Sequence, residues 1–499
     1  MYKTMKFPCI KIINSIKKAL SRHYHHTANQ LERSMTNMRS YQEALQALNE
    51  LQTNADYIKN VANQPRNASN IPEVIKFLGR TGLSVTDLDR LSVIHVTGTN
   101  GKGSTCAYTE KILRSHGCTT GFFSSPHLLD VRERIRINGK PISKTVFKNY
   151  FWKLYNLLNK QKDSPADMPL YFRFMTILAF HIFLDHKVDV AILEVGIGGE
   201  YDCTNVVRKT SVVGITPLDY DHMALLGNTL ESIAWNKAGI MKAGCSAFTV
   251  KQPSNALKVF EERSVEKNCS LTVVESDYYS GTNSNIPLHV RQTNASLALA
   301  LSEAFINKDT NNNFKKFDLD LAKRSIEETY WPGRYEIRNF QKNTFYLDGA
   351  HTLDSCCVCR DWFIAHVKNS KRKRCLIFNV TRARASEVFF KELTKCNFDV
   401  VIFIPNVGSS NDKPDTADFV CPAEKQLLQC EANKEQWLNM EETSNKKVEK
   451  AAVFPSFAQA VEFLNASGTY DCLVTGSIHL IGAAMSVLDP TLSGALEDD

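Results

Sequence analysis

One short loop combines glycines with a lysine in a pattern that binds phosphate. It follows the apolar run Leu91 to Thr97 and precedes a helical stretch that we expect to begin near Ser104. Glycine lets backbone N–H groups approach phosphate, a helix start favours negative charge, and Lys102 can reach the β- and γ-phosphates of a nucleotide. A solvated turn is the alternative. The predicted nucleotide-binding residues are Gly98, Thr99, Asn100, Gly101, Lys102, Gly103 and Ser104.

The loop lacks one usual magnesium ligand. Gly103 stands where a hydroxyl normally follows the lysine, so another oxygen must help to hold a metal. Polar residues occur after later apolar runs, where open α/β sheets place their ligand sites. Read alone, Glu194 could be a surface acid at a strand end, and His222 could be a packed or solvated histidine. The candidates are Ser124-Ser125-Pro126-His127, Glu194, Asp219 and Asp221-His222.

Buried strands alternating with helices would position these residues. The runs Leu91 to Thr97, Asp189 to Val195 and Ser211 to Thr216 are apolar enough for strands of a parallel sheet, and residues 103–116 and 172–187 are predicted helices. A second series of expected strands follows Trp331-Pro332-Gly333. These strands are Phe345 to Leu347, Cys375 to Val380, Val400 to Ile404 and Cys472 to Val474. The predicted fold class is therefore α/β, with helices covering both faces of the sheets.

Composition and charge set the outer limits. With 43% hydrophobic and 23% charged residues, the 499-residue chain is expected to be globular. Six of its seven net positive charges lie in residues 1 to 31, which argues against a broad nucleic-acid-binding surface.

The segment 1 to 31 is amphipathic and contains no acidic residue, which is typical of a mitochondrial presequence; a disordered basic tail is the alternative. Met35 or Met38 could start a shorter cytosolic product. The longest apolar run, Met175 to Leu184, is too short for a membrane span.

These patterns divide the chain into three parts. Residues 1–34 are the presequence or a disordered tail, residues 35–330 an ATP-binding domain, and residues 331–499 a smaller α/β domain. Residues 407–449 are polar, and we expect a mobile insertion with some helix and no chemistry.

Fourteen irregularly spaced cysteines predict reduced thiols, and the C-x-x-C pair Cys356 and Cys359 predicts helix packing rather than a zinc site.

Several motifs, in order from about residue 40 to the C-terminal LVTGSIHLIGAA, resemble folylpolyglutamate synthases of the Mur ligase superfamily. The motifs are GTNGKGS, SSPHLLDVRERIRING, LEVGIGGEYDCTN, DYDHMALLGNTLESIAWNKAGI, WPGRYE and YLDGAHT. The resemblance implies a P-loop ATPase domain with a mostly parallel sheet, followed by a smaller Rossmann-like domain. It also implies an enzyme that uses ATP to join L-glutamate to the γ-carboxylate of a reduced folate, acting as a monomer in mitochondria, in the matrix or at the inner membrane, and in the cytoplasm.

The resemblance assigns roles to individual residues. Lys102 contacts the β- and γ-phosphates, Ser125 and Glu194 hold Mg²⁺, and Glu194 with His222 hold a second Mg²⁺. Lys237 matches a carbamylated lysine that would help to hold the second ion; unmodified, it would be a counter-charge or a surface lysine. Arg334 and Asp348 match nucleotide-binding positions across the domain boundary, so catalysis should need closure. Asn294 matches an adenine-contacting asparagine, although alone it is more often a helix cap. His351 has no derived role, and a monovalent cation such as K⁺ is expected.

One loop departs from the family, and two other functions stay open. Thr381-Arg382-Ala383-Arg384-Ala385 replaces a glycine- and aspartate-containing turn, which puts any contact of that loop in doubt. The nearest alternative activity is that of a dihydrofolate synthase, which adds the first glutamate to dihydropteroate. A nucleotide-dependent binding switch is the alternative from another class.

Overall fold

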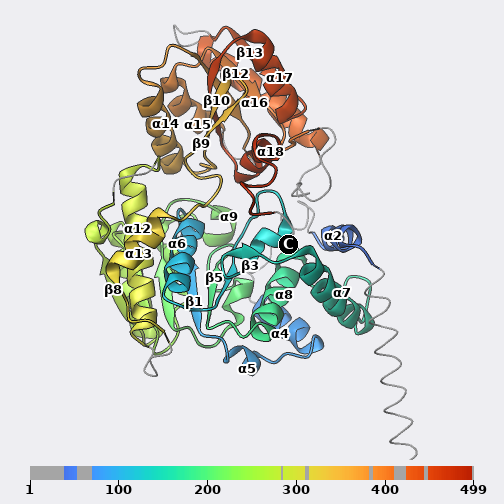
Figure 1. Cartoon of the computed structure of the whole chain (residues 1–499), viewed down its shortest axis with the longest axis vertical. Coiled ribbons are helices and arrows are strands. Elements are labelled where there is room, and N and C mark those ends of the chain that lie inside the picture. The colour runs from blue at the N-terminus through green and yellow to red at the C-terminus, as the bar shows by residue number, and fades with distance from the viewer. Residues whose placement is uncertain are drawn as a thin grey trace, which may run out of the picture.

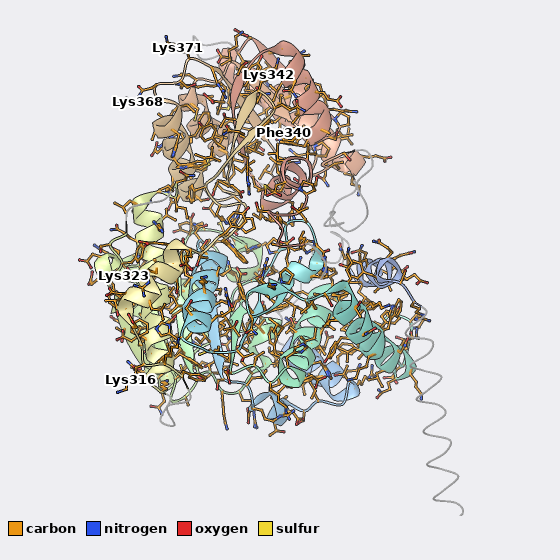
Figure 2. All side chains as sticks on the ribbon, viewed as in Figure 1. Lys316, Lys323, Phe340, Lys342, Lys368 and Lys371 are labelled. Carbon is orange, nitrogen blue, oxygen red and sulfur yellow. The ribbon has the colours of Figure 1, made fainter. Side chains whose placement is uncertain are left out.

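The computed structural model places two α/β sheets one above the other (Figure 1). It describes residues 39–52, 70–281, 285–308, 314–380, 386–409, 423–442 and 448–496. The predicted presequence and the altered loop at 381–385 lie outside the described residues. Here the N-terminal domain means the part built on the first sheet and the C-terminal domain the part built on the second. Figure 2 shows the labelled lysines, such as Lys316 and Lys371, at the outer edges of the two domains.

The N-terminal domain is built on an eight-stranded sheet in the order β4-β3-β2-β5-β1-β6-β7-β8. Only β3 and β4 run antiparallel to their neighbours. Its elements are α2 (Tyr41–Glu50), α4 (Asn70–Arg80), α5 (Val85–Leu88), β1 (Val93–Thr97), α6 (Lys102–Ser115), β2 (Thr120–Phe123), β3 (Ile135–Ile137), β4 (Lys140–Pro141), α7 (Lys144–Lys160), α8 (Tyr171–Asp185), β5 (Val190–Glu194), β6 (Val212–Ile215), α9 (Met223–Leu226), α10 (Leu230–Ala238), β7 (Ser246–Val250), α11 (Ser254–Glu266), β8 (Ser270–Val274), α12 (Leu288–Ile306) and α13 (Leu319–Glu327).

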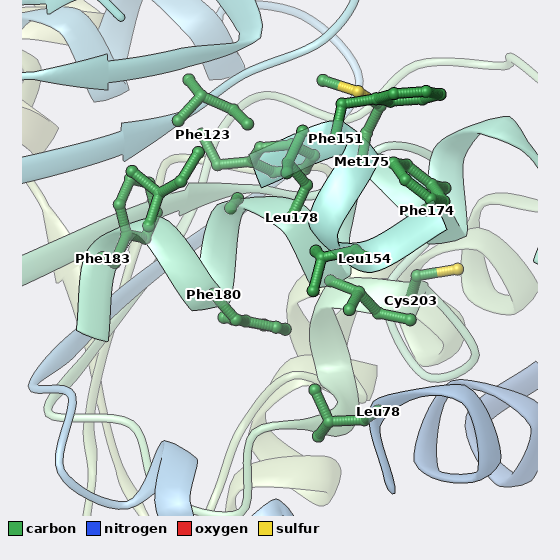
Figure 3. Packing of buried hydrophobic residues seen from close by; sticks show 14 of the residues in the cluster. Leu78, Phe123, Phe151, Leu154, Phe174, Met175, Leu178, Phe180, Phe183 and Cys203 are labelled. Carbon is green, nitrogen blue, oxygen red and sulfur yellow. The ribbon is translucent and has the colours of Figure 1, made fainter. Parts of the chain in front are cut away.

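The central strand β1 is buried on both faces because its side chains alternate between two cores. Ile94 and Val96 enter the core that α6 and α12 share, whereas Val93 enters the core beneath α7 and α8. Figure 3 shows part of that second core, where Phe151 of α7 meets Phe174 of α8 with ring centroids 5.0 Å apart. Burial on both faces fixes the strand and therefore the loop that leaves its carboxyl end.

The C-terminal domain has a six-stranded sheet in the order β13-β12-β11-β14-β10-β9, in which only β9 is antiparallel. Helices α14, α15 and α16 cover one face, and α17 and α18 cover the other. Its elements are β9 (Glu336–Phe340), β10 (Asn343–Leu347), α14 (Leu353–Val367), β11 (Lys373–Phe378), α15 (Ser386–Leu393), β12 (Val400–Phe403), α16 (Ala423–Glu442), β13 (Lys450–Val453), α17 (Phe457–Ser467), β14 (Tyr470–Thr475) and α18 (Ile478–Leu488).

The α/β fold class is confirmed, and each apolar run read as a strand coincides with one: β1, β5, β6, β10, β11, β12 or β14. The other seven strands were not predicted. Several of them, such as β8 and β13, lie at sheet edges with partly exposed side chains, so their sequences lack a continuous apolar run. Cys356 and Cys359 are buried on α14, as the packing interpretation requires. No helix among the described residues is long and apolar enough to cross a membrane.

Candidate functional site

The glycine-containing loop leaves β1 and turns directly into α6, which begins at Lys102, two residues before the expected start. The backbone N–H groups of Thr99 and Asn100 donate to the Pro217 carbonyl at 3.0 and 3.2 Å, which ties the loop to the end of β6. Gly101 adopts a φ of 85° at the N-cap. A Cβ atom there would also overlap the Asn294 side chain, so both conformation and space require glycine.

Two lysines converge on the carbonyl of Gly98. The Lys102 ammonium donates to this oxygen at 3.2 Å and to the Thr99 carbonyl at 3.1 Å. Lys237, on α10, donates to the same Gly98 oxygen at 2.6 Å and is buried. Burial, reinforced by the neighbouring Lys102 charge, lowers the pKa of Lys237 well below its usual range. The loop therefore has the Lys102 side chain at the cavity. Beneath the loop lies Lys237, whose amine loses its proton more readily than that of an ordinary lysine.

Glu194 is the last residue of β5 and lies beside Ser125, the serine predicted to hold Mg²⁺ together with it. The Ser125 backbone N–H donates to Glu194 Oε2 at 3.0 Å, and Glu194 is 4% exposed. Burial raises the pKa of Glu194, while Lys102, the Ser125 hydrogen bond and Arg334 act in the opposite direction. Two oxygen-bearing side chains, Ser125 and Glu194, thus meet Lys102 at the ends of neighbouring strands.

The loop that carries Ser125 also reaches into the other domain. Leu128 and Leu129, three and four residues further on, belong to the hydrophobic core formed with α17 and α18. Glu133 holds this loop in shape, because its carboxylate accepts from the backbone N–H groups of Leu129 at 2.7 Å and Asp130 at 2.8 Å. The position of Ser125 is therefore coupled to the packing of the C-terminal domain.

Asp221 joins two histidines from different domains. Its Oδ2 lies 3.4 Å from Nε2 of the adjacent His222 and 3.3 Å from Nε2 of His351, which follows β10. His222 itself adopts a φ of 51°, a left-handed conformation immediately before the short helix α9. The DGAH context of His351 predicts that it belongs to the site, and this contact gives it a partner there.

Arg334 and Asp348 lie together in the C-terminal domain. Asp348, at the end of β10, accepts from the Tyr335 backbone N–H at 3.1 Å. Burial raises the pKa of Asp348, and the positive charge of Arg334 partly offsets this increase. The carboxylate and the guanidinium face the same interdomain space as Lys102.

Asn294 is not a helix cap. It lies inside α12, whose N-cap is Pro287, and it is buried with its amide group at Gly101. The capping interpretation fails because the helix begins earlier than the polar residues around Asn294 suggested. Asn294 is instead brought to the glycine-containing loop by packing of α12 against α6.

A single cavity of about 1230 Å³ collects most of the predicted residues from both domains. Gly98 and Lys237 do not line it; they lie beneath the loop. The lining residues that the sequence predicted are Thr99, Asn100, Gly101, Lys102, Gly103, Ser104, Ser125, Glu194, His222, Asn294, Arg334 and Asp348.

Three features of the cavity wall were missed. Arg134 donates to His127 Nδ1 at 2.8 Å, and Asn100 donates across the domain boundary to Thr352 Oγ1 at 3.4 Å. The segment to which no chemistry was assigned contributes α16, whose Lys425, Gln426 and Gln429 line the cavity. The helix expected in this segment is present as α16, and composition did not indicate which surface that helix covers.

The donor set fits oxygen-liganded metals only in part. No group of three or more His, Cys, Asp and Glu side chains that could hold a metal occurs among the described residues. The adjacent Ser125 and Glu194 nevertheless suit Mg²⁺, which usually keeps several waters and binds through one or two carboxylates together with substrate phosphates. The arrangement can therefore bind a nucleotide between the domains with a hard cation at its phosphates.

Comparison with known proteins gives matches over nearly the whole chain, although no protein-family model matches it. It is 37% identical to the mitochondrial folylpolyglutamate synthase of Cricetulus griseus, covering 91% of this chain and 92% of the relative. It is 35% identical to the folylpolyglutamate synthase of Neurospora crassa, with coverages of 95% and 96%.

Solved structures with less than 25% identity share the fold. A Mycobacterium tuberculosis folylpolyglutamate synthase complexed with ADP and AMPPCP has a TM-score of 0.67 at 24% identity, covering 87% of this chain and 98% of the other. E. coli FolC in complex with DHPP and ADP has a TM-score of 0.63 at 24% identity, with coverages of 86% and 99%.

Proposed function

Since the chain belongs to the folylpolyglutamate synthase family, we propose that it extends tetrahydrofolate and its polyglutamates by ATP-dependent ligation of L-glutamate. The observation that carries this proposal is the cavity between the domains, where the phosphate-binding loop faces Arg334, Asp348 and His351. A site divided between two domains can hold ATP and an acid substrate and can close around both.

The reaction needs activation because a carboxylate is a poor acyl donor at neutral pH. The folate γ-carboxylate attacks the γ-phosphorus of ATP, which releases ADP and forms an acyl phosphate. The amine of glutamate then attacks the acyl carbon, phosphate leaves, and a proton is lost from nitrogen, giving the amide. The protein contributes mainly by positioning anionic reactants and offsetting their repulsion.

Each domain supplies part of the nucleotide site. Lys102 contacts the β- and γ-phosphates while the backbone of Gly98 to Gly103 surrounds them. Arg334 reaches a phosphate from the C-terminal domain, and Asp348 accepts from the ribose hydroxyls. Asn294, beside Gly101, contacts the adenine. Closure of the two domains excludes water, which would otherwise hydrolyse the acyl phosphate.

We infer that Ser125 and Glu194 would hold the Mg²⁺ of ATP. Held there, the cation would supply positive charge that offsets the negative charge of the phosphates. The second position assigned to Glu194, His222 and carbamylated Lys237 requires a rearrangement, because Lys237 bonds to Gly98 and His222 lies beside Asp221. A monovalent cation such as K⁺ belongs to the same proposal, and its test is ligation in potassium against choline buffer.

The carbamate proposal has physical support from the environment of Lys237. Only a neutral amine reacts with CO₂, and the depressed pKa of Lys237 keeps a neutral amine available. The product would carry a carboxylate in place of a cation. Loss of ligation in Lys237→Ala and its recovery with added acetate or propionate would support the carbamate; loss without any recovery would count against it.

A ligation assay tests the overall function. The purified chain receives ATP, labelled glutamate and either tetrahydrofolate or dihydropteroate, and the number of glutamates in each product is read by mass spectrometry. We expect tetrahydrofolate to be extended. Ligation of dihydropteroate alone would indicate a dihydrofolate synthase, and nucleotide binding without ligation of either acceptor would indicate a binding switch.

Location and assembly are proposed in the same way. The named mitochondrial relatives and the basic, acid-free residues 1–31 support import into mitochondria, and an internal start would leave a cytoplasmic form. We propose a monomer whose partners are its small-molecule substrates. Fractionation of cells that express the chain with and without residues 1–34 tests the location.

A further inference from the structure

Cys245 and Cys269 lie beside each other just before the first residues of β7 and β8. The proposed nucleotide site lies at the other, carboxyl ends of the strands. Strands β7 and β8 pair in parallel with Ser246 opposite Ser270, so Cys245 and Cys269 immediately precede a matched pair. The Ser270 N–H donates to the Cys245 carbonyl at 3.4 Å, and the Gly244 N–H donates to the Asn268 carbonyl at 2.9 Å. These bonds continue the strand pairing up to the two cysteines.

The spacing of paired strands suits a disulfide. Neighbouring strands lie about 4.8 Å apart, within the Cα–Cα range of roughly 4.4 to 6.8 Å that disulfides span. Residues opposite each other in a sheet also project their side chains to the same face. The Cys245 and Cys269 side chains therefore lie next to each other on one face of the sheet.

The surroundings of Cys245 favour its thiolate. The Lys242 backbone N–H donates to its sulfur at 3.4 Å. The hydrogen bond from Cys269, with a smaller contribution from the Lys308 charge, lowers the pKa of Cys245 to about 6, although burial acts in the opposite direction. Cys245 is 3% exposed and Cys269 is half-buried, so Cys269 is the more accessible member of the pair. A low-pKa thiolate next to a second thiol is the arrangement found in oxidant-sensitive proteins.

The chain contains its own comparison pair. Cys375 and Cys472 are opposite each other on the parallel strands β11 and β14. Both are completely buried. Burial raises the pKa of Cys472 well above its usual range. The two pairs therefore share their placement on neighbouring strands and differ in solvent access and charge.

We propose that Cys245 and Cys269 form an oxidant-reactive dithiol that a peroxide converts into a disulfide between β7 and β8. The Cys245 thiolate attacks one peroxide oxygen, the O–O bond breaks, and hydroxide leaves to give a sulfenic acid. The Cys269 sulfur then attacks the sulfenic sulfur, an S–S bond forms, and water leaves with the thiol proton. Two electrons pass from the two sulfurs to the peroxide, and a thiol reductant reverses the change.

Mapping the disulfide in the full chain tests this proposal. Reduced protein is treated with hydrogen peroxide, remaining thiols are alkylated, and a tryptic digest is compared with and without reductant. Trypsin separates the two cysteines into AGCSAFTVK and the peptide that starts at Asn268, so a reducible cross-link between these peptides reports the bond. We expect this cross-link while Cys375 and Cys472 remain alkylated. Absence of the cross-link, or oxidation of Cys375 and Cys472 at the same rate, would overturn the proposal.

Two variants separate the role of Cys245, which attacks the peroxide, from that of Cys269, which closes the disulfide. In Cys269→Ser, we expect a sulfenic acid at Cys245 that dimedone traps and no cross-link. In Cys245→Ser, we expect both the cross-link and most dimedone labelling at this site to disappear. Equal dimedone labelling of Cys269 in the Cys245→Ser protein would contradict Cys245 as the attacking sulfur. The wild-type digest decides the proposal by itself if either variant folds poorly.

Discussion

At the scale of single residues, Lys102 and Lys237 contact the same carbonyl but have different electrostatic environments. Lys102 lies at the cavity, close to the Glu194 carboxylate, where we propose that it binds phosphate. Lys237 is buried below the loop and shares its neighbourhood with Lys102, which disfavours a second positive charge. The two positions therefore call for different experiments.

Lys102→Ala should abolish ATP-dependent ligation while the chain stays folded. Loss of a charged contact to the transferred phosphate should lower kcat by at least about 10²-fold. Ligation rates and the circular dichroism spectrum check both parts. Lys316→Ala is the control, because Lys316 is exposed at the outer edge of the N-terminal domain (Figure 2). Full activity in Lys102→Ala would remove the phosphate role.

Lys237 should make stability depend on pH in a defined direction. Its folded pKa lies below the usual lysine value of 10.5, so the unfolded chain binds more protons at intermediate pH. Stability should therefore rise as the pH increases toward 10.5, and Lys237→Met should flatten this rise. Melting temperatures between about pH 8 and about pH 10, in CO₂-free buffer, provide the measurement. An unchanged slope in the variant would contradict the pKa shift.

At the scale of elements, α6 and α12 meet at Gly101 and Asn294. The sequence predicted α6 well because a strand, a glycine turn and a helix occur consecutively. It could not predict that the side chain of Asn294 fills the space beside Gly101, since nearly two hundred residues separate them. Tertiary packing of α12 against α6 decides that contact.

Gly101→Ala should weaken ATP binding for two separable reasons. The left-handed backbone costs about 1–2 kcal/mol for a residue with a Cβ atom, roughly a tenfold loss in affinity. Overlap with Asn294 adds to this loss. The double variant Gly101→Ala/Asn294→Ala removes the overlap. Calorimetry should therefore show that its loss of ATP affinity is smaller than the sum of the losses in Gly101→Ala and Asn294→Ala. Strict additivity would contradict the steric contribution.

Elements with exposed faces were the least predictable. The edge strands β8 and β13 have partly exposed side chains, and α16 lies in a polar segment that carried no chemical signal. Their positions depend on neighbours that are distant in the sequence. Most of the buried strands were predictable because burial on both faces requires a continuous apolar run. The buried strand β2 was not predicted, because only its last two residues are large and apolar.

At the scale of the whole molecule, one loop couples the two domains. It presents Ser125 to the cavity and inserts Leu128 and Leu129 into the core under α17 and α18. The α18 residue Gly482 faces the Leu128 carbonyl so closely that a Cβ atom would overlap it. Relative placement of the domains should therefore influence the position of Ser125, the proposed magnesium ligand.

Gly482→Ala tests this coupling. Alanine should stabilise α18 as a helix by roughly 0.5–1 kcal/mol yet displace the Leu128 loop, so ligation should fall on the order of tenfold or more. Gly79→Ala in α4 is the matched control, because a Cβ atom there meets nothing within 4 Å. Rates and thermal unfolding are measured for both. Equal ligation by the two variants would contradict coupling through Leu128.

The sequence by itself determined the α/β class, the strand–glycine turn–helix form of the 98–104 loop and the family, because these depend on consecutive residues. The tertiary structure alone decided that Asn294 reaches Gly101, that Asp221 bridges His222 and His351, that α16 lines the cavity and that Lys237 lies beneath the loop. These contacts join residues far apart in the chain. The local propensity of the sequence does not specify these contacts. They are specified by the packing of helices on the two sheets and of one domain on the other.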